Sequence, residues 1–213
     1  MAYLWRKLTP EQQAELLDHR MRIGLPWHSP PHFDYDDKRT FLLTAACFEH
    51  NPIIGATPER ISRFCGQLIE AIGSDSVKSW VVLPNHYHVL ASVGDLKSLA
   101  VRIGQLHGRT SRMWNLDDNS SGRKVWHRMS DRRIRGARHF HATVNYIHHN
   151  PVKHGYVEKW TQWPYSSAED YLNTVGVGQA TAVWREYPLD DYGKGWDDMP
   201  MPENPKASGR PRS

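Results

Sequence analysis

The chain has 213 residues, of which 39% are hydrophobic, so it can bury one core and has little room for a second. Its formal net charge of +4 is only a weak indication of a polyanionic partner unless the basic residues cluster. No apolar run is long enough to span a bilayer and no secretory pattern is present, which argues against the membrane-spanning and secreted classes. Cys47 and Cys65 are therefore expected to be reduced thiols of a cytosolic protein.

The first third of the chain predicts a polar helix, an irregular stretch, a strand and an amphipathic helix. Residues 10–22 fit a helix with Thr9 as its N-cap, and residues 25–38 are rich in turn formers. Residues 39–47 suit a buried strand. Residues 57–73 place apolar side chains at helical spacing after a Thr-Pro start, and a final glycine can end this helix.

The remaining elements follow from the same periodicities. They are, in chain order, strands over 76–83 and 86–93, a helix over 96–115, short extended pieces near 125–134 and a helix over roughly 137–149. Pro84 and Asn85 predict the turn of a hairpin, and Asp95 can cap the helix that follows it. Pro151 is expected to end the last helix, because a proline disfavours helical backbone in the residue before it. From about residue 188 the composition predicts a disordered basic tail.

The order of these elements predicts the fold class. A strand, a helix, two hairpin strands and a second helix, followed by one more short strand, is the order of a ferredoxin-like split βαβ antiparallel sheet, an α+β fold. Because one fold serves many functions, the function has to be argued from a site.

Two histidines stand one residue apart in the otherwise apolar strand 86–93. Side chains alternate across a strand, so His86 and His88 project from one face while Tyr87 faces the other way. Two imidazoles at this spacing can bind one cation together. The pattern is short and common, and a turn-capping histidine beside a half-exposed one is the simpler explanation. A third ligand and a reacting group are needed to favour a metal site.

The helix over 137–149 and the asparagine that follows it offer both. One stripe of this helix is apolar and is expected to face the sheet: Ala137, Phe140, Val144 and Ile147. A second stripe, offset by about 100°, holds His139, Thr143, Tyr146 and Asn150. Tyr146 and Asn150 are four residues apart and hence neighbours on one face. The alternatives are a tyrosine packed at the sheet edge and an asparagine that caps the helix before Pro151.

This set of side chains favours one kind of chemistry. Two imidazoles and an amide oxygen suit Mg²⁺ or Mn²⁺ better than a structural zinc, which usually has thiolate ligands. A phenol beside such a cation suggests attack on a phosphodiester. A phenol with a pKa near 10 is a weak nucleophile, and a cation on the phosphate oxygens would stabilise the charge that develops. The product would be a covalent phosphotyrosine that keeps the energy of the broken bond.

Basic residues cluster in the stretch between positions 102 and 138. Ten Lys or Arg residues and only three Asp lie there, which is a larger surplus than that of the whole chain. Arginines predominate, which favours phosphate and base-edge contacts, and Trp114, Trp126 and His127 are placed to stack on unpaired bases. The predicted DNA-binding residues are Arg102, Arg109, Arg112, Lys124, Arg128, Arg132, Arg133, Arg135 and Lys153. The alternative is a solvated helix face followed by a mobile loop.

These segments resemble a known family. LPNHYHVL at 83–90 resembles the His-hydrophobic-His (HUH) motif of single-tyrosine transposases. NYIHHNPVKHGYV at 145–157, followed by WPYSSAEDY at 163–171, resembles the C-terminal motif of REP-associated tyrosine transposases. VWHRMSDRRIR at 125–135 lies where that family has an aromatic and basic segment. The resemblance divides the chain into an N-terminal extension (1–37), a transposase domain (38–172) and a C-terminal extension with the disordered basic tail (173–213).

The resemblance also implies an activity. Members of the family have a ferredoxin-like sheet with the catalytic tyrosine on a following helix, and they cut single-stranded DNA next to palindromic hairpins through a 5′-phosphotyrosine. Carried over, the Mg²⁺ or Mn²⁺ ligands fall on His86, His88 and Asn150, and the nucleophile falls on Tyr146. The central motif residue is Tyr87, where an aliphatic residue is commoner. The implied protein is a DNA transposition enzyme of the cytoplasm and nucleoid, monomeric or homodimeric, with no membrane partner.

Two other functions remain open at this point. A domesticated, non-catalytic protein that binds DNA hairpins would keep the basic cluster, although the presence of all four site residues argues against it. A small-molecule metallohydrolase also fits the histidine pair, but such enzymes are usually longer and have repeated βα units.

Overall fold

The computed structural model describes residues 9, 11 and 39–194. The helices and strands are β1 (Arg39–Ala46), α3 (Pro58–Ile72), β2 (Val77–Val82), β3 (His86–Val93), α4 (Leu96–Asp117), β4 (Ser130–Arg133), α5 (Ala137–Lys153) and α6 (Ala168–Glu186), with short 3-10 turns at Phe48–His50, Ile54–Ala56, Ser74–Ser76 and Trp160–Gln162. The helix predicted over 10–22, the irregular stretch 25–38 and the tail from residue 195 onward lie outside the described residues, apart from Glu11, which is helical.

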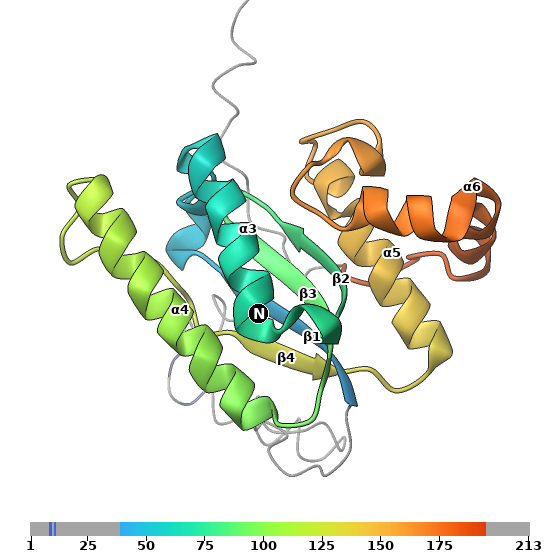
Figure 1. Ribbon diagram of the computed structural model, residues 1–213, viewed down its shortest axis with the longest axis horizontal. Helices are drawn as coiled ribbons and strands as arrows, with labels where there is room; N and C mark the ends of the chain where they lie inside the picture. The colour runs from blue at the N-terminus through green and yellow to red at the C-terminus, as the bar shows by residue number, and fades with distance from the viewer. Residues whose placement is uncertain (1–8, 10, 12–38, 195–213) are drawn as a thin grey trace, which may run out of the picture.

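The four strands form one antiparallel sheet in the order β2-β3-β1-β4. Helix α3 connects β1 to β2, β2 and β3 form the predicted hairpin, and α4 connects β3 to β4 (Figure 1). This arrangement confirms the predicted α+β class with a ferredoxin-like split βαβ sheet. The strand predicted near 125–134 is short and pairs with the outer side of β1.

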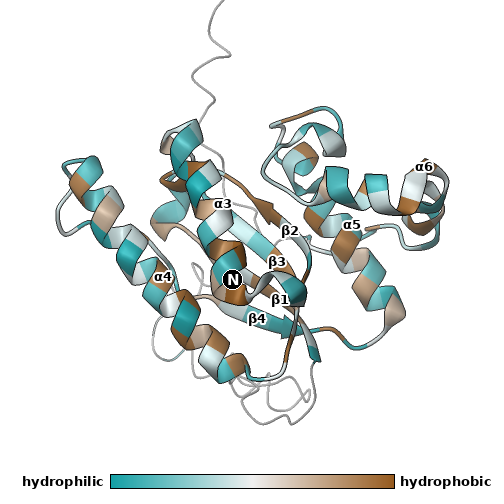
Figure 2. Ribbon diagram, in the orientation of Figure 1, coloured by the Kyte–Doolittle hydropathy of each residue, from teal (hydrophilic) through white to brown (hydrophobic). Residues whose placement is uncertain are grey.

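The larger hydrophobic core lies between the sheet and helices α3 and α4, which cover the same face (Figure 1). Tyr87 and Val89 of β3 point into this core and meet Phe64 of α3 and Ile103 of α4. Both helices alternate hydrophobic and hydrophilic residues along their length (Figure 2), as helices with one buried side do. Cys47 and Cys65 are free in this core, and burial raises the pKa of each thiol to about 12.

A smaller core forms on the opposite face of the sheet, under α5. Leu42 of β1 and Leu90 of β3 contact Val144 and Ile147 of α5, as the apolar stripe predicted. Ala137, at the start of the same stripe, is exposed because it is the first residue at the N-terminal end of the helix. The predicted histidine face of β3 therefore looks toward α5.

The capping residues predicted for α3 and α4 are found at the starts of these helices. Thr57 caps α3 by accepting a hydrogen bond from the Arg60 backbone N–H, and Asp95 caps α4 by accepting one from Ser98. Gly73 ends α3 with a φ of 98°, in the left-handed region that favours glycine. Helix α4 continues to Asp117, two residues beyond the predicted end.

The predicted end of α5 was wrong. The helix runs through Pro151 to Lys153 instead of ending at residue 149. Pro151 lies in the last turn, where its missing N–H costs a single backbone bond, and the His154 N–H still donates to the Asn150 carbonyl (3.1 Å). Asn150 is consequently inside the helix and buried, and its side chain is available for other contacts than capping.

None of the helices in the described part of the chain is long and apolar enough to cross a membrane.

Candidate active site

The two histidines of β3 and two residues of α5 meet between the sheet and the helix. His86 Nε2 lies 3.2 Å from Asn150 Oδ1, and His88 Nε2 lies 3.3 Å from the Tyr146 hydroxyl. The two imidazole centroids are 5.1 Å apart. All four side chains are at most 2% exposed. The structure thus brings together the four residues that the sequence singled out for catalysis and metal binding.

Two neighbours that the sequence analysis missed contact the other nitrogen of each imidazole. Asn85 Oδ1 lies 2.7 Å from His86 Nδ1, and Thr44 Oγ1 lies 2.7 Å from His88 Nδ1. Asn85 was predicted only as a turn former. Thr44 sits directly opposite His88 in the β1–β3 register, a relation that becomes visible only once the strand pairing is known.

Two further histidines flank the site. The His154 ring lies 5.2 Å from the His86 ring, and the His50 ring lies 6.4 Å from it. His154 follows Asn150 by four residues, so the helical spacing that found Tyr146 and Asn150 would have found it had the helix been extended past Pro151. Within the described residues, no three His, Cys, Asp or Glu side chains form a metal-binding group, so a site here depends on the amide of Asn150.

The C-terminal cover, which we define as residues 187–194, closes this site. Gly193 packs so tightly on the Tyr146 ring that a Cβ there would lie 2.1 Å from Tyr146 Cε2. Lys153 Nζ donates to the Gly193 carbonyl (3.2 Å), and the Tyr192 hydroxyl lies 2.5 Å from Thr143 Oγ1. Tyr146 is only 1% exposed beneath these residues, so it cannot contact a DNA phosphate while the cover stays in place.

This cover corrects one expectation from the sequence. Residues 188–194 were assigned to the disordered tail because of their Pro, Gly and Asp content, yet they pack on the smaller core. Leu189 and Tyr192 contribute apolar surface to it, and the Tyr187 carbonyl accepts a hydrogen bond from Asn145 Nδ2 (2.9 Å). Two apolar anchors and a few backbone bonds are enough to order a segment whose composition is otherwise typical of loops.

Some of the predicted DNA-binding residues lie beside the site. Arg132 of β4 pairs with Leu42 and so faces the α5 side of the sheet. Burial lowers the pKa of its guanidinium, while the phenols of Tyr192 and Tyr146 act in the opposite direction, which places the charge near both rings. Lys153 Nζ lies 5.7 Å from the centre of the Tyr146 ring. Arg133 and Arg135 lie at the end of β4 and before α5.

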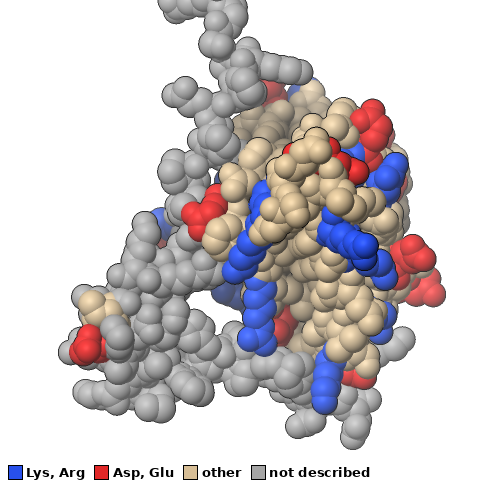
Figure 3. Space-filling model, turned by 90° about the vertical axis from the view of Figure 1, so that its left-hand side faces the viewer, with Lys and Arg blue, Asp and Glu red and all other residues tan. Residues whose placement is uncertain are grey.

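Other predicted DNA-binding residues lie on the opposite layer. Arg102, Arg109 and Arg112 are exposed on α4, which covers the face of the sheet away from α5. Figure 3 views the molecule from the α4 side and shows Lys and Arg side chains spread over this face. Arg102 also donates to the Ala71 carbonyl (2.9 Å). Lys124 and Arg128 belong to the segment between α4 and β4, where Lys124 Nζ lies 4.6 Å from the centre of the Phe48 ring.

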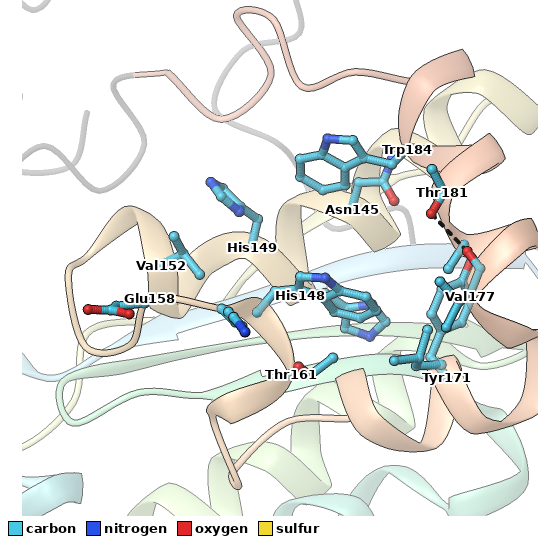
Figure 4. Close-up of a pocket in the computed structure, with 14 residues that line it drawn as sticks. Asn145, His148, His149, Val152, Glu158, Thr161, Tyr171, Val177, Thr181 and Trp184 are labelled. Carbon is cyan, nitrogen blue, oxygen red and sulfur yellow. Dashed lines mark hydrogen bonds between the residues drawn. The ribbon is translucent and has the colours of Figure 1, made fainter.

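A separate cavity of about 460 Å³ lies between α5 and α6 (Figure 4). His148, His149 and Trp184 line it together with Tyr171 and Val177. His148 is held by Ser79 and Ser167 (both 3.0 Å), and burial lowers its pKa to about 3. Neither histidine of β3 lines the cavity, and neither does Tyr146, so it is distinct from the candidate active site.

Comparisons with known proteins found relatives of one family. A REP-associated tyrosine transposase of Escherichia coli (strain K12) is 30% identical over 94 residues, which cover 43% of this chain and 53% of the relative. A Haemophilus influenzae protein (strain Rd) carries the same family name and is 33% identical over 96 residues, covering 40% of this chain and 54% of the relative. This chain is similar to the REP-associated tyrosine transposases. The match spans about half the length of these curated relatives.

A solved structure shares the fold. It is the structure of a REP-associated tyrosine transposase bound to a REP hairpin, and it matches with a TM-score of 0.50 and 22% identity over 67% of this chain and 84% of that one. A scan against protein-family models found no match. The resemblance inferred from the LPNHYHVL and NYIHHNPVKHGYV segments is confirmed by these relatives.

Proposed function

We propose that this chain is a metal-dependent endonuclease and strand transferase. It cuts single-stranded DNA next to hairpin-forming repeats through a 5′-phosphotyrosine intermediate. The observation that carries the proposal is the meeting of a tyrosine hydroxyl, two imidazoles and a buried amide at one point between β3 and α5. The names of the relatives, and the hairpin bound to the solved structure, support DNA as the partner.

The residues present fit a divalent cation. His86 and His88 would hold it through Nε2 and Asn150 through its side-chain oxygen, a set without thiolates that suits Mg²⁺ or Mn²⁺. The Asn150 amide nitrogen is buried and has no hydrogen-bond partner among the described residues, so no partner there holds the amide in another orientation. When bound, the cation would stabilise the charge on the non-bridging phosphate oxygens.

Tyr146 is the nucleophile in this proposal. Its oxygen attacks the phosphorus, the bond from phosphorus to the 3′ oxygen breaks, and the 5′ phosphate stays on the tyrosine. The phenol gives up its proton and the departing 3′ oxygen takes up one, so the step is balanced. The phosphotyrosine keeps the energy of the broken phosphodiester, which allows a second 3′ hydroxyl to reverse the reaction on another strand. Action on chromosomal DNA in the cytoplasm, as a monomer or homodimer, belongs to the same proposal.

One observation favours a second candidate function, a non-catalytic hairpin-binding protein. Tyr146 is 1% exposed beneath the C-terminal cover, and a chain that never opens would bind hairpins through its arginines without cutting.

The experiment that separates the two functions is covalent capture. The wild-type chain, incubated with hairpin-containing single-stranded DNA and Mn²⁺, is expected to form a protein–DNA adduct on a denaturing gel. Tyr146→Phe should form none, and His88→Ala should lose the adduct while it still binds the hairpin. Tyr171→Phe, on α6, is the matched control and should behave as wild type. An adduct from Tyr146→Phe as strong as that from wild type would overturn the mechanism, and hairpin binding without any wild-type adduct would favour the second function.

A further inference from the structure

The Asn85 side chain is held at both ends of its amide. Its Nδ2 donates to the His50 carbonyl (3.2 Å), and its Oδ1 lies 2.7 Å from His86 Nδ1. A carbonyl oxygen can only accept, so the bond to His50 fixes which end of the amide is nitrogen. The oxygen must therefore face His86.

This orientation decides where His86 carries its proton. An amide oxygen can only accept, so the hydrogen bond requires a hydrogen on His86 Nδ1. In a neutral imidazole the other nitrogen then keeps its lone pair. That nitrogen, Nε2, points at Asn150 Oδ1 at 3.2 Å. Either a cation lies between these two acceptors or the Asn150 amide turns its unpartnered Nδ2 toward Nε2. In both cases Nε2 carries a lone pair, as a metal ligand must.

The backbone that supplies the His50 carbonyl is strained. Glu49 and His50 both have left-handed backbone, with φ of 58° and 52°. This conformation is unfavourable for non-glycine residues and persists only where the surroundings impose it. The turn is joined to Asn85 a second time, because the Cys47 N–H donates to the Asn85 carbonyl (2.7 Å). The strained turn thus places the group that orients the amide.

His88 has an equivalent partner on the neighbouring strand. Thr44 Oγ1 lies 2.7 Å from His88 Nδ1, and His88 Nε2 faces the Tyr146 hydroxyl at 3.3 Å. The Thr44 hydroxyl can accept from Nδ1–H or donate to Nδ1. When it accepts, Nε2 keeps its lone pair, and the Tyr146 hydroxyl can then donate to it. Both imidazoles are therefore contacted at Nδ1 and present Nε2 toward α5, His86 to Asn150 and His88 to Tyr146.

We propose that Asn85 and Thr44 are positioning residues that hold His86 and His88 in the Nδ1-protonated tautomer that a divalent cation requires. The inference rests on the proposed function for the existence of the cation, but the tautomer itself is a property of the metal-free chain. Partners of this kind typically change metal affinity about 10- to 100-fold when they are removed.

The first measurement needs no variant. Nitrogen-15 NMR of the metal-free full chain distinguishes the two imidazole tautomers, and His86 and His88 are expected to show a protonated Nδ1 and a lone pair on Nε2. A protonated Nε2 on His86 would overturn the proposal for Asn85, and the same result for His88 would overturn it for Thr44.

The second measurement is the affinity of the full chain for Mn²⁺. Asn85→Ala and Thr44→Val are expected to bind Mn²⁺ about 10- to 100-fold more weakly than wild type. Asn85→Asp and Thr44→Ser keep an acceptor and should retain affinity within a few-fold. The control is Ser92→Ala, which removes a hydroxyl that pairs with Thr40 (3.1 Å) on the same two strands outside the site.

The outcomes separate this inference from the proposed function. Equal Mn²⁺ binding by wild type, Asn85→Ala and Thr44→Val overturns the positioning role and leaves the metal site intact. A wild-type chain that binds no Mn²⁺ overturns both. Should Asn85→Ala fail to fold, the comparison of Thr44→Val with Thr44→Ser and the tautomer of the wild-type chain still decide the question.

Discussion

Asp118 joins three parts of the chain through its carboxylate. It accepts hydrogen bonds from Arg60 of α3 (2.5 and 2.9 Å) and from Arg123 in the loop after α4 (2.7 Å). The hydrogen bond from Arg60, followed by that from Arg123, holds the pKa of Asp118 at about 2. The Arg60 side chain is only 9% exposed, so its charge depends on this partner.

Asp118→Ala should therefore destabilise the fold. We expect the free energy of unfolding in urea to fall by about 1–3 kcal/mol, because a largely buried charged donor loses its acceptor. Asp117→Ala is the matched control, since its carboxylate is 55% exposed and 4.0 Å from the same guanidinium, and it should cost less than about 0.5 kcal/mol. Equal losses for the two variants would contradict this account.

His107 makes stability depend on pH. Its ring stacks on Trp126 (4.2 Å between centroids) and its Nε2 lies 3.1 Å from the Tyr87 hydroxyl. Burial lowers its pKa to about 4, below the value near 6.5 of an unfolded chain. The unfolded state thus binds the extra proton first, and the contribution of His107 is present above pH about 6.5 and is lost as the pH falls toward 4.

When the pH falls from 7.5 to 5, protonation linked to His107 should lower the free energy of unfolding of the wild-type chain by about 2 kcal/mol. Urea titrations at the two pH values measure it. His107→Gln removes the titrating group, so the difference should shrink by about that amount. Other histidines with a lowered pKa, His148 (about 3), His139 and His149, contribute to the pH dependence that remains. An unchanged difference in His107→Gln would show that His107 does not titrate as inferred.

Among the helices and strands, the sequence predicted the features that depend on interactions between residues close together in the chain. Caps at Thr57 and Asp95 located α3 and α4 within a residue or two, and the apolar runs on either side of the Pro84-Asn85 turn located β2 and β3 equally well. The helical spacing of Tyr146 and Asn150 placed two site residues on one face. The rest depends on contacts between distant segments. Thr44 joins the site only through strand pairing, and α5 passes Pro151 because packing on the sheet outweighs one missing bond.

The C-terminal cover is the element that the sequence could least predict. Its composition is that of a loop, and its order comes from Leu189 and Tyr192 packing on α5 and from Gly193 lying on the Tyr146 ring. No periodicity marks such a segment. Under the proposed function its position would decide whether Tyr146 can meet a substrate, because these eight residues would have to move away before the hydroxyl could reach a phosphate.

Gly193→Ala should open the cover. The added Cβ would lie 2.1 Å from Tyr146 Cε2, at a backbone φ of 79° that alanine rarely adopts. We expect the rate of adduct formation to rise, by about tenfold for each 1.4 kcal/mol by which closure is weakened. Gly178→Ala, within α6 where a Cβ meets nothing within 4 Å, is the matched control and should leave the rate unchanged. A Gly193→Ala chain that reacts no faster than this control would show that the cover does not limit access.

In the whole molecule, the predicted DNA-binding residues lie on two opposite sides of the sheet. Arg109 and Arg112 lie on α4, on one side of the sheet, whereas Arg132 and Lys153 lie on the other side beside Tyr146. In the sequence the three arginines belong to one cluster between the halves of the site, and Lys153 follows the second half. Under the proposed function the two groups would have different tasks. The arginines on α4 would contribute only to holding DNA, and Arg132 and Lys153 would be close enough to act on the phosphate that Tyr146 would attack.

Substitutions in the two layers should therefore have different effects. Arg109→Ala with Arg112→Ala should weaken hairpin binding and reduce the slope of log affinity against log salt by about 1–2, because each phosphate contact contributes about 0.9. Adduct formation at saturating DNA should be unchanged. Arg132→Ala should instead slow adduct formation at saturating DNA roughly 100-fold, since it removes a charge beside the reacting phosphate, with little change in affinity. Arg185→Ala, on α6, is the control for both assays. A loss of affinity without a loss of rate in Arg132→Ala would assign that residue to DNA holding as well.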